Sequence, residues 1–303
     1  MGKGPSGIVL LDKPPGPTSF DMVRVVRRGY GTRKVGHTGT LDPFASGLLV
    51  ICLGEGTKLV PYLQSGEKEY LATVRFGVET DTLDTEGEVV REASPDGLES
   101  SAVEDALEGF IGVVDQVPPA HSAIKVDGRR AYELARRGKA PELAARQVRV
   151  HSLELLGFDL PDARLRLVCG SGYYVRSLAR DLGAALGLPA HLTALRRTRN
   201  AGFDVADAAG PDAHGPDQAP APPIPLEAAL PGLPELRLDR DDAIGVGHGR
   251  PPVDVPPGLG RGPIRLVDEL GCLLALAATE GDGLRLLRVF PADPRRFDPA
   301  ASD

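Results

Sequence analysis

The chain has 303 residues, of which 42% are hydrophobic and 25% are charged, a composition that fits one large globular domain or a large domain with a small one. Its apolar runs are shorter than the roughly 20 residues that a membrane-spanning helix needs, and the first residues lack the pattern of a signal peptide. The three cysteines are isolated and odd in number, which excludes a disulfide framework or a zinc knuckle and favours a reducing cytoplasm.

The net charge of −7 argues against a nucleic-acid partner, but its distribution along the chain does not. Residues 1–68 carry a net charge of +4 and residues 121–200 one of +8, whereas 69–120 and 201–303 are acidic, with −11 and −8. A polyanion responds to the local potential, so two basic segments that share one face could hold phosphates. Solvated faces without a partner explain the charge equally well at this point.

The predicted elements of the first two hundred residues follow no regular repeat. Residues 7–11 predict a strand, and Thr18 and Ser19 can cap a helix whose apolar side chains recur at helical spacing. Because strands and helices are interspersed without a βαβ period, we expect an α+β fold on a mixed or antiparallel sheet. The patterns predict further strands at 48–53, 70–76, 147–151 and 164–169, and helices at 101–111, around 132–137 and at 173–187.

A change in composition marks a domain boundary near residue 209. We predict a catalytic domain over residues 1–208, with an insertion at about 117–151. Residues 209–232 begin with a stretch rich in proline and alanine that should form neither a helix nor a ladder, and we interpret them as a semi-rigid linker. Residues 233–303 predict a small all-β domain, since short apolar strands alternate there with glycine turns. These strands lie at 264–267, 272–277 and 284–290.

Residues 36–47, with the sequence Gly-His-Thr-Gly-Thr-Leu-Asp-Pro-Phe-Ala-Ser-Gly, have the features of a reactive loop. The glycines allow close backbone approach or positive φ angles, and Pro43 keeps the residue before it out of the helical region. Asp42 is thereby presented from a restrained loop as a candidate nucleophile or base. On these residues alone, an ordinary turn aspartate is the more common alternative.

Motifs for several other chemistries are missing from the sequence. The Gly-x-Ser-x-Gly elbow of a nucleophilic serine and the phosphate-cradling Gly-x-x-x-x-Gly-Lys-Ser/Thr loop do not occur. The six histidines show no ligand spacing, so we expect no metal, and we expect no cofactor. A lone carboxylate without a metal fits covalent catalysis at carbon, of which attack at a sugar is one case.

Residues 36–48 resemble the active-site signature of the TruB-type family, the bacterial enzymes that make pseudouridine at position 55 in the T-loop of tRNA. Other stretches resemble further motifs of that family: residues 11–19, 68–70, 77–87, 116–132, 172–183 and 195–198. The resemblance runs from residue 7 to about 200 and implies a pseudouridine synthase catalytic domain, with residues 233–303 similar to the small RNA-binding β domain of PUA type. It implies an isomerase that binds the T-arm of tRNA and flips out the target uridine. We further expect a cytoplasmic monomer that binds no membrane.

The resemblance also implies roles for individual residues. Asp42 would be the nucleophile that cleaves the uridine glycosidic bond, and Arg176 the cation that keeps its carboxylate ionised. Tyr70 would stack on the base and bring a phenol near its C5 atom. The remaining residues expected to bind the substrate are His37, which would fill the vacated stack, Tyr174, the apolar pocket wall Leu195, Arg129, Arg130, and Lys13, which we expect to pack against the active-site loop. Further candidates for phosphate contacts are Arg27, Arg28, Arg33, Lys34, Arg136 and Arg137.

Three other functions remain as alternatives. A catalytic subunit of a guide-RNA complex would share the chemistry, but the short chain, the lack of basic tails and Thr38 favour the stand-alone type. An RNA-binding protein with a vestigial site would lack a key residue, whereas the candidate nucleophile, tyrosine and arginine are all present. A hydrolase with an aspartate nucleophile would release free base and leave an abasic site. The acidic character of residues 201–303 argues against a strong phosphate-binding role for the last domain.

Overall fold

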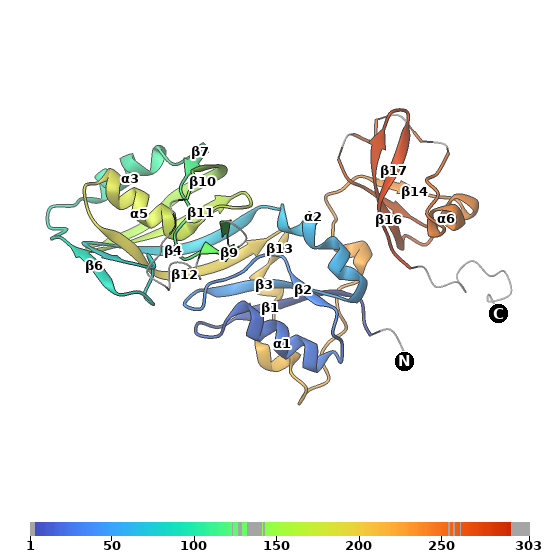
Figure 1. The fold of residues 1–303 in the computed structure, drawn as a ribbon, viewed down its shortest axis with the longest axis horizontal. Coiled ribbons are helices and arrows are strands. Elements are labelled where there is room, and N and C mark those ends of the chain that lie inside the picture. Colours follow the sequence, from blue (N-terminus) through green and yellow to red (C-terminus); the bar gives the residue numbers. More distant parts are fainter. Residues whose placement is uncertain are drawn as a thin grey trace.

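The structure is a computed structural model that describes residues 4–122, 124–126, 129–131, 141, 143–253, 255–256, 258–260 and 262–291. It has a larger body built on one long sheet and a smaller C-terminal body with a sheet of its own (Figure 1). The helix expected around residues 132–137 lies outside the described residues, so that prediction stays open. None of the helices in the described ranges is both long and apolar enough to cross a bilayer.

A mixed nine-stranded sheet organises the larger body, which confirms the predicted fold class. Its order is β1-β3-β12-β4-β11-β10-β7, with β2 added to β3 and β13 added to β12. Strands β3 and β12 pair in parallel and the other neighbours are antiparallel. The strands are β1 (Gly7–Lys13), β2 (Val35–His37), β3 (Ser46–Leu53), β4 (Lys68–Phe76), β7 (Gly112–Gln116), β10 (Arg146–Asp159), β11 (Asp162–Cys169), β12 (Ala190–Asn200) and β13 (Phe203–Asp204).

Helix α1 (Ser19–Gly29) begins at the predicted cap and packs on one face of the sheet. The Thr18 hydroxyl accepts a hydrogen bond from the backbone N–H of Asp21, whose carboxylate accepts one from the N–H of Thr18. This reciprocal capping box satisfies N–H groups that a helix start leaves unpaired. The apolar face of α1 packs on alternate residues of β1 and β3, which are Val9, Leu11, Leu49, Ile51 and Leu53.

Two further helices, α3 (Ser100–Glu108) and α5 (Val175–Ala185), pack on the part of the sheet formed by β4, β10, β11 and β12. Both were predicted, α3 as an acidic amphipathic helix and α5 as a helix that ends at Gly187, and α5 is the one that carries Arg176 into the core. The shorter elements are η1 (Gly54–Leu59), α2 (Val60–Gln64), β5 (Val78–Thr80), β6 (Val89–Glu92), β8 (Lys125–Val126), β9 (Arg129–Arg130) and η2 (Val205–Asp207).

Residues 209–224, here called the strap, lie along the edge of β1 that faces away from β3. Isolated bridges join Ile8 to Ile224 and Leu11 to Ala209, and the 3-10 turn η3 (Pro211–His214) packs beside α1. The expectation of a segment without helix or ladder is therefore wrong in detail. Prolines remove donors, but the N–H and C=O groups of single residues between them still pair with the exposed strand edge.

The smaller body is a four-stranded sheet with one helix on it. The order is β14-β15-β16-β17, in which β14 and β15 are parallel and the other pairs antiparallel. Helix α6 was not predicted, because it begins with three charged residues, has two glycines in its last three positions and buries only Ala243 and Val246. The bounds are β14 (Glu235–Arg237), α6 (Arg240–Gly247), β15 (Ile264–Val267), β16 (Leu273–Glu280) and β17 (Gly283–Val289), preceded by the turn η4 (Leu226–Ala228).

One apolar cluster runs through both bodies. It contains Leu10 and Val50 from the long sheet together with Val267, Leu276 and Phe290 from the C-terminal sheet. The two sheets are thus packed on a shared core, and their relative position is fixed by buried apolar contacts.

Candidate active site

The loop that carries Asp42 is fixed to the start of α1. The hydroxyl of Ser19 donates to the backbone carbonyl of Leu41 at 2.9 Å and accepts from its N–H at 2.8 Å. The N–H of Gly16 donates to the carbonyl of Pro43 at 2.8 Å. The backbone is therefore pinned on both sides of Asp42, as expected for a restrained loop.

Lys13 holds the same loop from beneath. Its ammonium donates to the carbonyls of Pro14, Pro17 and Pro43 at 2.9, 2.8 and 3.1 Å, and the residue has no exposed surface. Burial lowers the pKa of Lys13 to about 8, opposed by the charges of Asp42 and Glu86. With all three donors used, Lys13 supports the loop as we expected, but the structure does not place it where it could bind a substrate.

Arg176, from the first turn of α5, forms a two-pronged ion pair with Asp42. Its Nε lies 2.9 Å from Oδ2 and its Nη2 lies 3.2 Å from Oδ1 of that carboxylate. The same guanidinium donates to the carbonyls of Thr82 and His121, each at 2.9 Å, and lies 3.5 Å from a carboxylate oxygen of Asp84. A planar fork suits such a site, because each of its three nitrogens has a partner oxygen within 2.9 Å.

The two partners of this ion pair differ in exposure. The Arg176 side chain is 6% exposed, whereas one third of the Asp42 side chain faces solvent. Burial raises the pKa of the Asp42 carboxyl and Asp84 adds to the shift, while Arg176 opposes it. The open side of the carboxylate is therefore available to a ligand, and its charge depends on the guanidinium behind it.

The predicted aromatic residues lie around this pair. Tyr70, on β4, is 7% exposed, and burial raises the pKa of its phenol against the opposing charge of Arg197. Tyr174 immediately precedes α5, and its backbone N–H and C=O both pair with the side-chain amide of Gln116. The charge of Asp42 acts on both phenols, so the structure brings these three predicted residues together.

Of the other predicted residues, His37 and Leu195 are close to the loop. His37 ends β2, and its Nδ1 accepts a hydrogen bond from the N–H of Gly39 at 3.3 Å. Burial lowers the pKa of His37, and the charge of Arg197 lowers it further, so the ring is neutral. Leu195 belongs to the apolar cluster that includes Tyr70 and Leu41.

The predicted phosphate contacts are only partly described. The side chains of Arg129 and Arg130, and the whole of Arg136 and Arg137, lie outside the described residues. Lys34 is taken up by an ion pair with Glu55 at 2.7 Å. Arg28 and Arg33 are exposed, and Arg27 is half-buried beside the ring of Phe20.

Sequence reasoning assigned no role to Asp84 or Gln116. Asp84 is 2% exposed and accepts hydrogen bonds from Thr82 Oγ1 at 2.6 Å and from the N–H of Glu86 at 3.0 Å. It lies in the stretch 77–87 that resembles a family motif, but its polar neighbours are also typical of an ordinary turn. Neither sequence spacing nor periodicity indicates that such a turn meets α5 in space.

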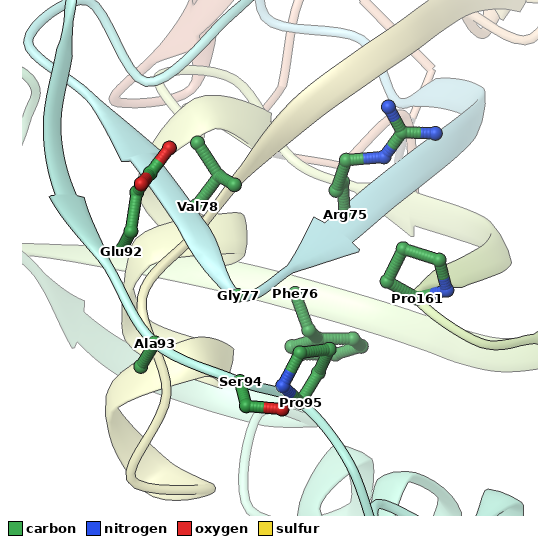
Figure 2. Close-up of a pocket in the computed structure, with 9 residues that line it drawn as sticks. All are labelled: Arg75, Phe76, Gly77, Val78, Glu92, Ala93, Ser94, Pro95 and Pro161. Atoms are coloured by element: carbon green, nitrogen blue, oxygen red, sulfur yellow. The ribbon is translucent and has the colours of Figure 1, made fainter.

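The groove in Figure 2 lies away from these residues, at the end of β4 and beside the start of β5. Its volume is about 500 Å³, and Phe76 is six residues along the strand from Tyr70, or roughly 20 Å at 3.3 Å per residue. None of the predicted site residues lines it. The lining residues are Arg75, Phe76, Gly77, Val78, Glu92, Ala93, Ser94, Pro95 and Pro161.

A metal centre is not evident in the part of the chain that the structure describes, where no three His, Cys, Asp or Glu side chains are grouped to hold an ion.

Residues 27–175 match the model of the TruB family pseudouridylate synthases, N-terminal domain. The chain is 44% identical over 304 residues to the tRNA pseudouridine synthase B of Leifsonia xyli subsp. xyli, with 97% of this chain and 99% of that protein covered. It is also 44% identical to the protein of the same name from Thermobifida fusca, with 94% and 98% covered.

Solved structures with the same fold come from larger assemblies. An H/ACA ribonucleoprotein bound to a substrate RNA containing 2'-deoxyuridine gives a TM-score of 0.71 at 25% identity, over 97% of this chain and 87% of that one. A Cbf5-Nop10-Gar1 complex gives a TM-score of 0.70 at 26% identity, over 94% and 85%.

Proposed function

The chain belongs to the TruB family of pseudouridylate synthases, and on that premise we propose that Asp42 is its nucleophile, Arg176 the cation that keeps the nucleophile ionised, and Tyr70 the aromatic partner of the base. The observation that carries this proposal is the two-pronged ion pair between a buried guanidinium and a carboxylate whose far side is open. Such a pair fixes the position of the negative charge and leaves one side of the carboxylate accessible to a substrate.

The reaction is an isomerisation that needs no net proton or electron. The bond from C1′ to N1 of uridine breaks, the uracil turns, and C1′ bonds to C5, which loses the proton that N1 gains. An ionised Asp42 can attack C1′ or assist the elimination that frees the base. Burial raises the pKa of Tyr70, so at neutral pH it is a phenol, which can stack on the base and form a hydrogen bond near C5.

We propose that the substrate is tRNA and that the modified uridine is position 55 in the T-loop. Support comes from the near-complete overlap at 44% identity with proteins named tRNA pseudouridine synthase B, against 25% identity with the chain of the H/ACA assembly. The enzyme would act as a cytoplasmic monomer. It would use residues 1–208 for catalysis and 233–303 as a PUA-like domain, with residues 209–232 connecting them.

A uridine inside a folded T-loop has to be extruded before the carboxylate can reach it, at a cost of a few kcal/mol for unstacking. His37 is the residue that we propose to fill the vacated stack, because its ring is neutral and held by Gly39 at the edge of the loop. Tyr174 and Leu195 would contact the flipped nucleoside, and Arg129 and Arg130 of the insertion would contact phosphates.

The decisive experiment treats unmodified tRNA transcript with the wild type and with Asp42→Asn, then maps pseudouridine by carbodiimide tagging and mass spectrometry. We expect a tag in the T-loop with the wild type and none with the variant. The variant should still bind tRNA, because Arg176 keeps Asp84 and two carbonyls as partners.

The same experiment separates the alternatives. Pseudouridine formed by Asp42→Asn would contradict the proposed role of the carboxylate. An abasic site in place of pseudouridine would indicate a hydrolase. A wild type that converts RNA only when guide RNA and helper proteins are added would indicate a subunit of the guide-RNA type.

A further inference from the structure

Strand β12 carries an arginine that the proposed chemistry has not used. Arg197 is 1% exposed, and its strand β12 lies between β3 and β4 in the long sheet. Burying a guanidinium costs several kcal/mol unless its donors are satisfied, so its partners indicate what it does.

Those partners are the two ends of the catalytic loop. The Nε of Arg197 donates to the carbonyl of Leu48 at 2.7 Å, and Nη2 donates to the carbonyl of Gly39 at 3.1 Å. Gly39 stands three residues before Asp42 and Leu48 six residues after it. One rigid fork therefore closes the loop that carries the carboxylate.

Close backbone packing reinforces this closure. Gly47, the residue before Leu48, has a φ of +102°, and a Cβ there would collide with the carbonyl oxygen of Arg197. The end of the loop thus lies directly on β12, with no side chain between them. The other side of the loop is tied to the same strand, because Nδ2 of Asn200 donates to Thr38 Oγ1 at 3.0 Å.

Arg197 also meets the second catalytic group. It stands opposite Tyr70 in the register of β12 and β4, and its positive charge lowers the pKa of the phenol against the effect of burial. The nearby ammonium of Lys68 donates two of its three N–H groups to the carbonyls of Gln64 and Gly66.

We propose that Arg197 is a positioning residue of the isomerisation, which sets the distance between the Asp42 carboxylate and the Tyr70 phenol by closing the Asp42 loop at the point of β12 that stands opposite Tyr70. The inference rests on the proposed roles of Asp42 and Tyr70. Arginine suits this task because its rigid fork reaches the two carbonyls through separate nitrogens, Nε and Nη2, whereas a lysine has a single nitrogen.

The test compares Arg197→Lys with Arg196→Lys, the same substitution one residue away. Arg196 is partly exposed and pairs with Asp12 on β1, so its variant is a control for strand β12 itself. We expect the single-turnover rate at saturating enzyme to fall by about 10- to 100-fold for Arg197→Lys, with the Kd for tRNA unchanged, because a shift of the reacting groups by about 1 Å costs this much. The rate of Arg196→Lys should stay within about twofold of the wild type.

A second comparison distinguishes positioning from plain stabilisation. Rates are measured well below the melting temperature of each variant, and Arg197→Lys is combined with Tyr70→Phe, which removes the phenol. If Arg197 acts partly through that phenol, the two rate losses should be less than multiplicative. Should Arg197→Lys fail to fold, Arg197→Gln, which buries no charge, replaces it in every arm.

Two results would overturn the proposal: an Arg197 variant within threefold of the wild-type rate, or rate losses that multiply fully with Tyr70→Phe. The proposed function has separate outcomes, because retained activity in Asp42→Asn contradicts it whatever the Arg197 variants do. An inactive Asp42→Asn beside a fully active Arg197→Lys would leave that function intact and remove the positioning role alone.

Discussion

The Arg176 guanidinium is balanced by two carboxylates, Asp42 and Asp84, of which only the first reaches solvent. The inner carboxylate gives the arginine a partner that a substrate does not disturb. The outer one can then lose its charge to a covalent bond during the reaction without leaving a buried cation unpaired, a situation that costs several kcal/mol.

The pH dependence of the chemical step follows from this balance. In the proposed mechanism Asp42 acts as an ionised carboxylate, so the single-turnover rate should fall as the pH drops through its pKa. Because burial raises that pKa above the ordinary value of 3.8, the fall should begin at a higher pH than for an exposed aspartate. Rates measured from about pH 4 to 9 at saturating enzyme, with tRNA binding followed separately, test this.

Arg176→Gln is the companion variant for this profile. It removes the positive charge that lowers the pKa of Asp42, so the pH at which the rate falls to half its maximum should rise further. A rate that stays flat down to pH 4, or a midpoint that moves down in Arg176→Gln, would contradict the assignment.

At the scale of elements, helix α1 presents a basic face next to the active-site loop. Phe20 is 51% exposed, and the guanidinium carbons of Arg24 and Arg27 lie 4.7 and 5.9 Å from the centroid of its ring. Arg24 pairs with Asp21 at 3.1 Å, and Arg28 is exposed. A polyanion bound at the loop would therefore lie next to the basic face of α1.

We therefore predict that Arg27→Ala/Arg28→Ala weakens tRNA binding without changing the rate for bound tRNA. Each lost phosphate contact should reduce the slope of log K against log salt concentration by about 0.7 to 0.9. Filter binding or fluorescence titration between 50 and 200 mM salt measures this slope. Arg164→Ala, on the remote β10–β11 hairpin, is the matched control, and an equal slope in both variants would count against this face of α1.

Elements with a continuous apolar run, with alternating apolar residues or with apolar residues at helical spacing were predictable from sequence. Strands β1 and β3 are continuous runs, β4 and β11 alternate, and α1 and α3 have helical spacing, whereas α5 was predicted from the glycine that ends it. Strand β12 was not predicted, because it buries Arg197 and Asn200 and so replaces apolar alternation by polar residues whose partners are distant in the chain. The residue types of the site were predictable from the family resemblance. The closure of the Asp42 loop by Arg197 was not predictable, since its partners are backbone carbonyls, which leave no trace in the sequence.

On the scale of the whole molecule, the shared apolar cluster makes the two bodies one cooperative structure. Phe290, at the end of the C-terminal sheet, is 2% exposed and packs in the same cluster as Leu10 and Val50 of the long sheet. Lys58 connects them further, with its ammonium 2.6 Å from the carbonyl of Val289 and 5.5 Å from the Phe290 ring.

We expect calorimetry of the full chain to show a single unfolding transition. Phe290→Ala should lower the free energy of unfolding by about 3 to 5 kcal/mol, because it leaves a cavity in a core that both bodies share. Phe20→Ala, the same substitution at a half-exposed site, should cost less than about 1 kcal/mol. Two resolved transitions in the wild type, or a Phe290→Ala effect confined to one of them, would contradict a shared core.

The strap has a consequence for how the chain is made. Strand β1 pairs with β3 on one edge. Its other edge is bridged by Ala209 and Ile224, which are synthesised about two hundred residues later. At 5 to 20 residues per second, roughly 10 to 40 s pass on the ribosome between the two events. During that interval the nascent protein exposes the outer edge of the very strand that ends in Lys13, the support of the catalytic loop. A growing chain therefore presents this edge early and covers it only after residues 209–224 have been made.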